Sequence, residues 1–166
     1  MPEVKNVSAF TVKNEGLTNR LKNNVTVCNG DLCCEAIALW DTGATSSCIS
    51  KQVADALNLP ITGYQHIRTP SGESTVNTYM VNIILPNNVL ISDVRVCGTE
   101  IGNQGIGVLI GMDIISLGDF SVSTFNGETW FSFRTPSVKH TDYVEQIKFQ
   151  KTIGPTHGKG IRKHKK

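Results

Sequence analysis

Alternating apolar and polar residues predict β-strands over much of this chain of 166 residues. Residues 24–28 alternate, Asn29-Gly30 follows, and an apolar stretch then runs over residues 32–40. Asn-Gly between two apolar runs is a strong signal for a β-hairpin closed by a type I′ turn. A shorter alternation, over residues 7–12, predicts a peripheral strand ahead of this hairpin.

Two further hairpins are expected downstream. Residues 65–85 alternate clearly in their second half, and the polar turn Pro70-Ser71-Gly72-Glu73 divides them. Residues 119–134 carry the dipeptide Asn126-Gly127 between two apolar arms. The second arm has Trp130 directly beside Phe131, so both of its faces carry apolar residues. Each face is therefore expected to be buried against another part of the structure. A second copy of the chain could bury one of the two faces.

Two short helices are expected between the strands. Ser50 is a suitable N-cap for a helix over residues 51–57, whose apolar residues fall on one face. A second helix is expected over residues 112–117, closed by Gly118 as its C′ residue. The chain is long enough to form one domain around these elements, with its own core.

Charge is distributed unevenly along the chain. Residues 1–136 carry a net charge of −4 and residues 137–166 one of +6, which gives the total of +2. The C-terminal stretch is basic and largely without apolar periodicity, so we expect a flexible tail. Such a tail could contact nucleic acid or another acidic surface. No interleaved aromatic pattern accompanies the charges, and a solvated tail is the simpler interpretation.

The five cysteines are Cys28, Cys33, Cys34, Cys48 and Cys97, and they lie mostly in apolar strand patterns. Their odd number and setting are typical of buried thiols in a reducing compartment, so we expect a cytoplasmic protein. A structural metal site is the alternative. Adjacent residues of a strand point to opposite faces, however, and we expect no metal.

No apolar run in the sequence approaches the length of a membrane span, and the first residues do not resemble a signal peptide. We therefore expect no membrane partner.

The motif around which the chain is organised is Asp41-Thr42-Gly43-Ala44, which directly follows the apolar residues 36–40. A carboxylate held between two buried segments is rigid and poorly solvated, which is the setting in which its pKa can be shifted for chemistry. Taken alone, Asp-Thr-Gly is also an ordinary β-turn sequence. A second motif, Leu109-Ile110-Gly111, lies directly ahead of the second expected helix.

Together the two motifs resemble those of retropepsin-like aspartic peptidases, the single-domain enzymes of retroviral and bacterial type. The resemblance implies an all-β fold, a closed acid-protease barrel with two short helices. This domain would cover residues 24–136, with residues 1–23 as an N-terminal strand or extension and residues 137–166 as a basic tail.

The resemblance also assigns roles to residues. Asp41 would be the catalytic carboxylate, Thr42 would lock the loop, and Gly43, followed by Ala44, would allow a close approach of the backbone. Leu109-Ile110-Gly111 would pack beneath that loop. The turn Pro70-Ser71-Gly72-Glu73 would be the tip of a flap over the substrate, although its Pro70 and Glu73 depart from a glycine-only tip.

A single Asp-Thr-Gly in the chain implies that the active species is a homodimer to which each subunit contributes one Asp41. Two carboxylates held close together share one proton, because both cannot ionise. The ionised one would activate a water for attack on a peptide bond, the other would protonate the carbonyl oxygen, and no cofactor is needed. Two other functions fit the sequence: a dimeric binding or scaffolding module without turnover, and a nucleic-acid-associated protein that acts through its tail.

Overall fold

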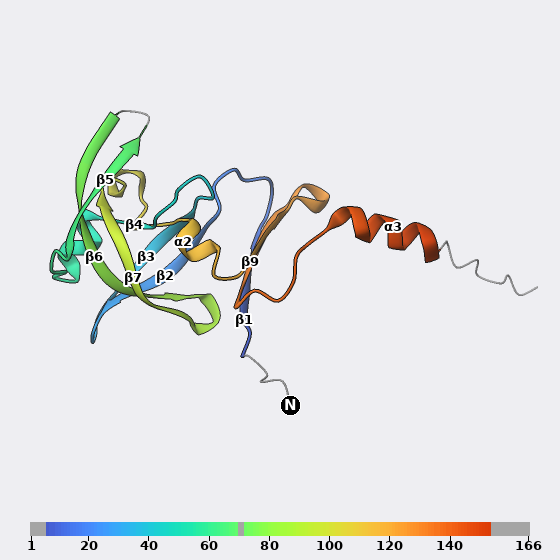
Figure 1. The fold of residues 1–166 in the computed structure, drawn as a ribbon, viewed down its shortest axis with the longest axis horizontal. Helices are drawn as coiled ribbons and strands as arrows, with labels where there is room; N and C mark the ends of the chain where they lie inside the picture. The colour runs from blue at the N-terminus through green and yellow to red at the C-terminus, as the bar shows by residue number, and fades with distance from the viewer. Residues whose placement is uncertain (1–5, 70–71, 154–166) are drawn as a thin grey trace, which may run out of the picture.

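The computed structural model describes residues 6–69 and 72–153, so Pro70 and Ser71 of the expected flap tip lie outside the described residues (Figure 1). The strands are β1 (Ser8–Asn14), β2 (Lys22–Asn29), β3 (Leu32–Trp40), β4 (Cys48–Ser50), β5 (Gly63–Thr69), β6 (Gly72–Leu85), β7 (Val89–Thr99), β8 (Val108–Ile110), β9 (Asp119–Ser123) and β10 (Thr129–Thr135). The α-helices are α1 (Lys51–Ala56), α2 (Met112–Ile115) and α3 (Tyr143–Ile153), and the short 3-10 turns are η1 (Pro86–Asn88), η2 (Gly102–Gln104) and η3 (Phe125–Gly127).

Six of the described strands close into a barrel. The larger sheet has the order β2-β3-β8-β4-β7-β6-β5, and β2 also pairs with β6, which joins the two sides of the sheet. β8 lies parallel to β3 and antiparallel to β4, while β4 lies parallel to β7. Parallel neighbours need a long crossover, so these pairings bring together segments that are far apart in the chain. The expected all-β acid-protease barrel is confirmed.

A second sheet, with the order β1-β10-β9, lies beside the barrel (Figure 1). β1 pairs antiparallel with β10 along its whole length, from Ser8 opposite Thr135 to Asn14 opposite Thr129. The peripheral strand predicted near the N-terminus therefore exists, and it shares a sheet with the last strand of the fold.

Aromatic rings join the second sheet to the barrel. Trp40 of β3 stacks on Phe120 of β9, with 5.1 Å between ring centroids, and packs against Phe133 at 5.2 Å. Phe10 and Phe131 complete the cluster, and both are at most 3% exposed. Each large aromatic ring removes a wide apolar area from water, so this cluster is a major contribution to the core.

The two expected helices are present but shorter than predicted. α1 begins at the expected N-cap, where the hydroxyl of Ser50 accepts a hydrogen bond from the N–H of Val53 at 3.2 Å. α2 ends at Ile115, and Gly118 does not close it, because its φ lies outside the left-handed region. A Cβ on Gly118 would collide with the carbonyl oxygen of Arg134, so close packing rather than helix termination requires glycine here.

A third helix, α3, forms where the sequence pattern of residues 143–149 is compatible with either a short helix or a strand. It lies within the stretch predicted to be a flexible tail, and Asp142 caps it by accepting hydrogen bonds from the N–H groups of Val144 and Glu145. The side chains of residues 143–151 are exposed, and Figure 1 shows the helix standing away from both sheets. No helix in the described ranges is long and apolar enough to cross a membrane.

The expectation of five reduced thiols is wrong for two of the cysteines. Cys28 and Cys33 face each other across the β2–β3 hairpin and form a disulfide. Cys34, Cys48 and Cys97 carry free thiols. The prediction failed because the alternation pattern did not place Cys28 directly opposite Cys33. The cysteines therefore no longer support a reducing compartment.

The register of that hairpin also differs from the prediction. Asn29 pairs with Leu32, so Gly30 and Asp31 form the turn, and of these two only Gly30 has a positive φ, at 58°. A type I′ turn needs positive φ at both central residues, so this one belongs to another type. In the third hairpin Asn126 and Gly127 do both have positive φ, within η3.

Candidate active site

Asp41 directly follows β3, and its backbone continues the pairing of that strand with β8. The N–H of Asp41 donates to the carbonyl oxygen of Ile110 at 2.9 Å, which continues the parallel pairing of Trp40 with Ile110. Trp40 is 5% exposed within the aromatic cluster, and its indole N–H donates to Asn23 at 2.6 Å. The bulky residue ahead of Asp41 therefore anchors it, and Asp41 itself is half-buried.

The residues after Asp41 form a tight loop closed by its own hydrogen bonds. The N–H of Gly43 donates to Oδ1 of Asp41 at 2.8 Å, and the N–H of Ala44 donates to the carbonyl oxygen of Asp41 at 3.2 Å. A Cβ on residue 43 would lie 3.2 Å from the same Oδ1, which favours glycine. Thr42 and Gly43 are exposed, and the loop presents a carboxylate in a defined orientation.

The glycine motif lies directly beneath this loop. Leu109 pairs with Cys48 of β4, and Ile110 is fully buried. A Cβ on Gly111 would lie 2.8 Å from the carbonyl carbon of Ser46, so a larger residue would displace the loop. The N–H groups of Met112 and Asp113, at the start of α2, donate to the carbonyl oxygens of Ala44 and Thr45, at 2.8 and 3.2 Å.

Ser47 and Asp113 support the loop in a way that the sequence analysis missed. Oγ of Ser47, which is fully buried, donates to Oδ1 of Asp113 at 2.7 Å and accepts from the N–H of Gly111 at 2.9 Å. The N–H of Ser47 donates to Oδ2 of Asp113 at 2.9 Å. A serine and an aspartate 66 residues apart carry no local signal of this pairing, although a carboxylate at the start of a helix is one hint.

Two thiols lie behind the loop, on neighbouring strands. Cys48 of β4 is the register partner of Cys97 of β7. Burial raises the pKa of Cys48 to about 12, and the nearby Cys97 and Asp113 add to this effect. Burial also raises the pKa of Cys97. Both thiols are therefore protonated near neutral pH and are poor nucleophiles.

The hairpin of β5 and β6 extends away from the barrel (Figure 1). The last cross-strand pair of this hairpin is Thr69 with Gly72. Gly72 has a φ of 129°, which favours glycine. Nε of Arg68 donates to Oε1 of Glu73 at 2.9 Å, so an ion pair joins the two strands near the tip. The structure thus contains a hairpin at the position expected for the flap.

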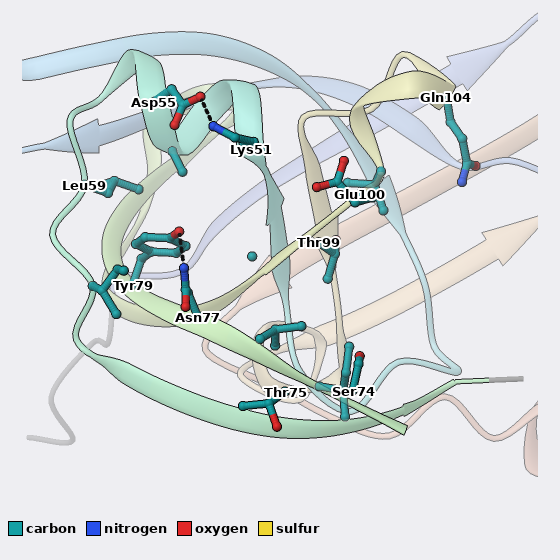
Figure 2. A pocket seen from close by; sticks show the side chains of 16 residues that line it. Lys51, Asp55, Leu59, Ser74, Thr75, Asn77, Tyr79, Thr99, Glu100 and Gln104 are labelled. Carbon is teal, nitrogen blue, oxygen red and sulfur yellow. Dashed lines mark hydrogen bonds and ion pairs between the residues drawn. The ribbon is translucent and has the colours of Figure 1, made fainter. Parts of the chain in front are cut away.

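A cavity of about 950 Å³ opens between α1, this hairpin and the end of β7 (Figure 2). Ile67 and Val76 of the hairpin line one part of it, and Lys51 and Glu100 line another. Asp41 is not among its lining residues, so the cavity and the carboxylate are separate features of the surface.

The chemistry available at the Asp41 loop is proton transfer. A carboxylate that is oriented by one main-chain N–H and still partly open to solvent can accept a proton from a bound water or donate one to a substrate. Within residues 6–69 and 72–153, no three His, Cys, Asp or Glu side chains lie together in a group that could hold a metal ion.

The barrel, the Asp-Thr-Gly loop and the glycine-led helix beneath it define the retropepsin-like aspartic protease fold. The family described as gag-polyprotein putative aspartyl protease matches residues 34–117, half of the chain. The chain belongs to that family.

Several solved structures are similar to this chain, among them three proteases. A retropepsin-like aspartic protease from Rickettsia conorii has 13% identity and a TM-score of 0.49, over 78% of this chain and 94% of that one. The protease of EIAV, in complex with the inhibitor HBY-793, has 20% identity and a TM-score of 0.49, over 60% and 88%. The simian foamy virus (mac) protease has 16% identity and a TM-score of 0.42, over 56% and 89%. No curated protein matches the sequence.

Proposed function

We propose that this protein is an aspartic endopeptidase that acts as a homodimer, with one Asp41 from each subunit. The observation that carries the proposal is the geometry of the Asp41 loop. Its carboxylate is half-buried, oriented by the N–H of Gly43, and supported from below by Gly111 and by the Ser47–Asp113 pair. Membership of an aspartyl protease family supports the same assignment.

The mechanism needs one carboxylic acid and one carboxylate at the same place. Two close Asp41 side chains share a proton, because the first negative charge opposes ionisation of the second group. The ionised Asp41 takes a proton from a water as that water attacks the carbonyl carbon of a peptide bond. The protonated Asp41 donates to the carbonyl oxygen, which gives a neutral tetrahedral intermediate. The other Asp41 then passes the proton that it took from water to the amide nitrogen, a hydroxyl proton returns to the first Asp41, and the C–N bond breaks to release the amine and the acid. No covalent intermediate and no cofactor are required.

The residues around Asp41 take supporting roles in this proposal. Thr42 is exposed next to Asp41, where its hydroxyl can hold the loop of the partner subunit in register. Leu109, Ile110 and Gly111 keep the loop rigid from below. The hairpin that ends in Gly72 and Glu73, with Pro70 and Ser71 between its strands, would close over an extended peptide as a flap.

The first test replaces the carboxylate with an amide. Asp41→Asn should lower the rate of peptide cleavage by at least roughly a hundred-fold, the low end of the usual contribution of acid–base groups, with an unchanged circular dichroism spectrum. Digestion of a peptide library at several pH values measures this. Asp31→Asn, a matched change in an exposed turn, should keep full activity. Equal activity of Asp41→Asn and wild type would refute the role of Asp41.

The second test addresses the shared site. Wild type mixed with an excess of Asp41→Asn should lose more activity than dilution alone explains, because mixed dimers hold a single carboxylate. The assay is peptide turnover at fixed wild-type concentration. Activity that follows only the wild-type dose, together with a sedimenting monomer, would overturn the homodimer model. A stable dimer that cleaves no peptide would instead identify a binding module on the same fold.

A further inference from the structure

Asn23 is a polar residue at a core-facing position of β2. Side chains alternate between the two faces of a strand, so Asn23 shares a face with Val25 and Val27, which are at most 3% exposed. Asn23 itself is half-buried. Taking an amide out of water is unfavourable unless its donors and its acceptor find hydrogen-bond partners. The side chain of Asn23 therefore requires a specific polar partner at this position.

The indole N–H of Trp40 is that partner. Asn23 lies opposite Ala38 of β3, and Trp40 is its diagonal neighbour two residues further along that strand. Nε1 of Trp40 donates to Oδ1 of Asn23 at 2.6 Å, and Nδ2 of Asn23 donates to the carbonyl oxygen of Asn24 at 2.8 Å. Both ends of the amide are used, so the orientation of the Asn23 side chain is fixed.

The hydrogen bond to Asn23 restrains the indole in a direction that ring packing leaves open. The indole of Trp40 lies almost parallel to the ring of Phe120, at an interplanar angle of 6°. Stacking on a flat ring defines the plane of the indole, and the contacts with the tilted phenyl rings around it, at 49–54°, are non-directional. A hydrogen bond is directional, so Asn23 defines where the indole lies within its plane.

The position of Trp40 affects Asp41 through the backbone, because the two residues are consecutive. The N–H of Trp40 donates to the carbonyl oxygen of Leu21, and the N–H of Asp41 donates to that of Ile110, both at 2.9 Å. The carboxylate of Asp41 in turn accepts from the N–H of Gly43 at 2.8 Å. A movement of the indole would displace the peptide group between Trp40 and Asp41. A displacement of about 1 Å at a reacting group can lower a rate roughly a hundred-fold.

We propose that Asn23 is a positioning residue for the peptidase reaction, and that it sets the position of Asp41 through the indole of Trp40. This inference rests on the proposed peptidase function and adds to it a residue outside both sequence motifs. Loss of the acceptor would leave the buried indole N–H without a partner, which favours a shift of the ring toward another acceptor. Ser47 holds the loop from the side of α2, whereas Asn23 acts from the side of β2.

The first experiment measures turnover. Asn23→Leu keeps the approximate size of the side chain and removes the acceptor, so it should lower kcat about ten-fold and leave KM within about two-fold of the wild type. Asn23→Asp keeps an oxygen at the acceptor position and should restore kcat to within about three-fold of the wild type. All rates are measured well below the thermal midpoint of each variant and per folded dimer, so a loss of folded protein does not contribute.

The control is Asn24→Leu. It makes the same change at the exposed neighbouring position of β2 and keeps the carbonyl oxygen to which Asn23 donates. Its kcat and KM should equal those of the wild type.

The second experiment does not depend on turnover. In amide NMR spectra of the full-length protein, Asn23→Leu should move the indole signal of Trp40 and also the backbone amide signal of Gly43, whose N–H reports the hydrogen bond to Asp41. Asn24→Leu should move neither signal.

The two experiments separate the role of Asn23 from the peptidase function. A moved Gly43 signal without cleavage of any peptide by the wild type would support the control of Asp41 by Asn23 and overturn the peptidase. Normal cleavage with an unmoved Gly43 signal, or with a lower thermal midpoint of Asn23→Leu and an unchanged kcat, would overturn the positioning role and keep the peptidase. Absence of both cleavage and a moved signal would overturn both.

Discussion

Ser47 links the Asp41 loop to the segments beneath it. Its hydroxyl and N–H both donate to Asp113, and its hydroxyl also accepts from the N–H of Gly111. These hydrogen bonds link the end of the Asp41 loop, just ahead of β4, to the glycine motif and to α2. The orientation of the candidate catalytic carboxylate therefore depends on a fully buried serine that is not part of either recognised motif.

Ser47→Ala should lower the free energy of unfolding by about 1–3 kcal/mol, because the buried N–H of Gly111 loses its acceptor. Chemical denaturation measures the loss. Ser46→Ala is the control, since Ser46 contributes its carbonyl oxygen rather than its hydroxyl to the contact with Cys48. Equal stability of Ser47→Ala and wild type would show that the network beneath the loop does not hold it in place.

Cys48 should resist alkylation. A pKa of about 12, against an ordinary value of 9.0, leaves roughly a thousand-fold less thiolate at pH 8. Cys34 and Cys48 are both half-buried, and burial raises the pKa of Cys34 too, but at Cys48 the nearby Cys97 and Asp113 add to the effect of burial. Iodoacetamide should therefore modify Cys34 before it modifies Cys48 or the buried Cys97. Peptide mass spectrometry over time gives the rates. Faster modification of Cys48 than of Cys34 would contradict a Cys48 thiol that stays protonated.

At the scale of elements, the carboxylate of Asp119 joins β9 of the second sheet to the segment that follows β10. Asp119, at the start of β9, accepts hydrogen bonds from the hydroxyl of Ser137 at 2.6 Å, from the N–H of Val138 at 2.8 Å and from Nε of Arg134 at 2.5 Å. These three donors, with Ser137 the strongest, hold the pKa of Asp119 well below its ordinary value of 3.8. The segment after β10 is thereby tied to β9.

Asp119→Asn should destabilise the protein at neutral pH, and the difference from wild type should shrink in acid. A carboxyl whose pKa is lowered by folding contributes stability above its unfolded pKa, and this stability is lost as the pH falls through the folded pKa. The gap between the two thermal unfolding midpoints should therefore be full at pH 7 and narrow below pH 3.8. Glu35→Gln, on the exposed side of β3, should show no such gap. A gap that is constant with pH would exclude this linkage.

At the scale of the whole molecule, α3 and the barrel are separate. The described side chains of α3 are exposed, including the apolar Tyr143, Val144, Ile147 and Phe149, so the helix adds little to the core. The contacts to Asp119 extend as far as the backbone of Lys139. The structural boundary of the fold thus lies close to residue 139, slightly beyond the end of β10.

A chain that ends at His140 should keep its thermal midpoint and its peptide turnover, because loss of exposed residues changes stability by no more than about 0.5 kcal/mol. A chain that ends at Pro136 also loses Ser137 and Val138, and it should unfold at a lower temperature. Thermal unfolding and a peptide assay compare the two. Loss of turnover in the longer of the two truncated chains would show that α3 or the basic residues beyond it take part in the active species.

Local patterns in the sequence were sufficient to predict that the hairpins, the N-cap of the first helix and the Asp41 loop exist. Asn126-Gly127 supplies the two positive φ angles of its turn, Ser50 caps α1, and the apolar residues of β3 lead directly to Asp41. Each of these features is stabilised by residues within a few positions of one another, so its free energy is encoded in a short stretch. The aspartyl protease family matches residues 34–117, a range that contains both motifs.

Only the tertiary structure decided which distant segments meet. Ser47 pairs with Asp113 across 66 residues, Thr11 of β1 faces Ser132 of β10 across 121, and neither pairing has a local signal. The register that joins Cys28 to Cys33 also escaped the pattern, because a shift of one residue changes every cross-strand partner. Such contacts are selected by the burial of the whole core and by the closure of the barrel. The sequence by itself determined the local elements and the motif around Asp41, and the global packing determined the network that holds them.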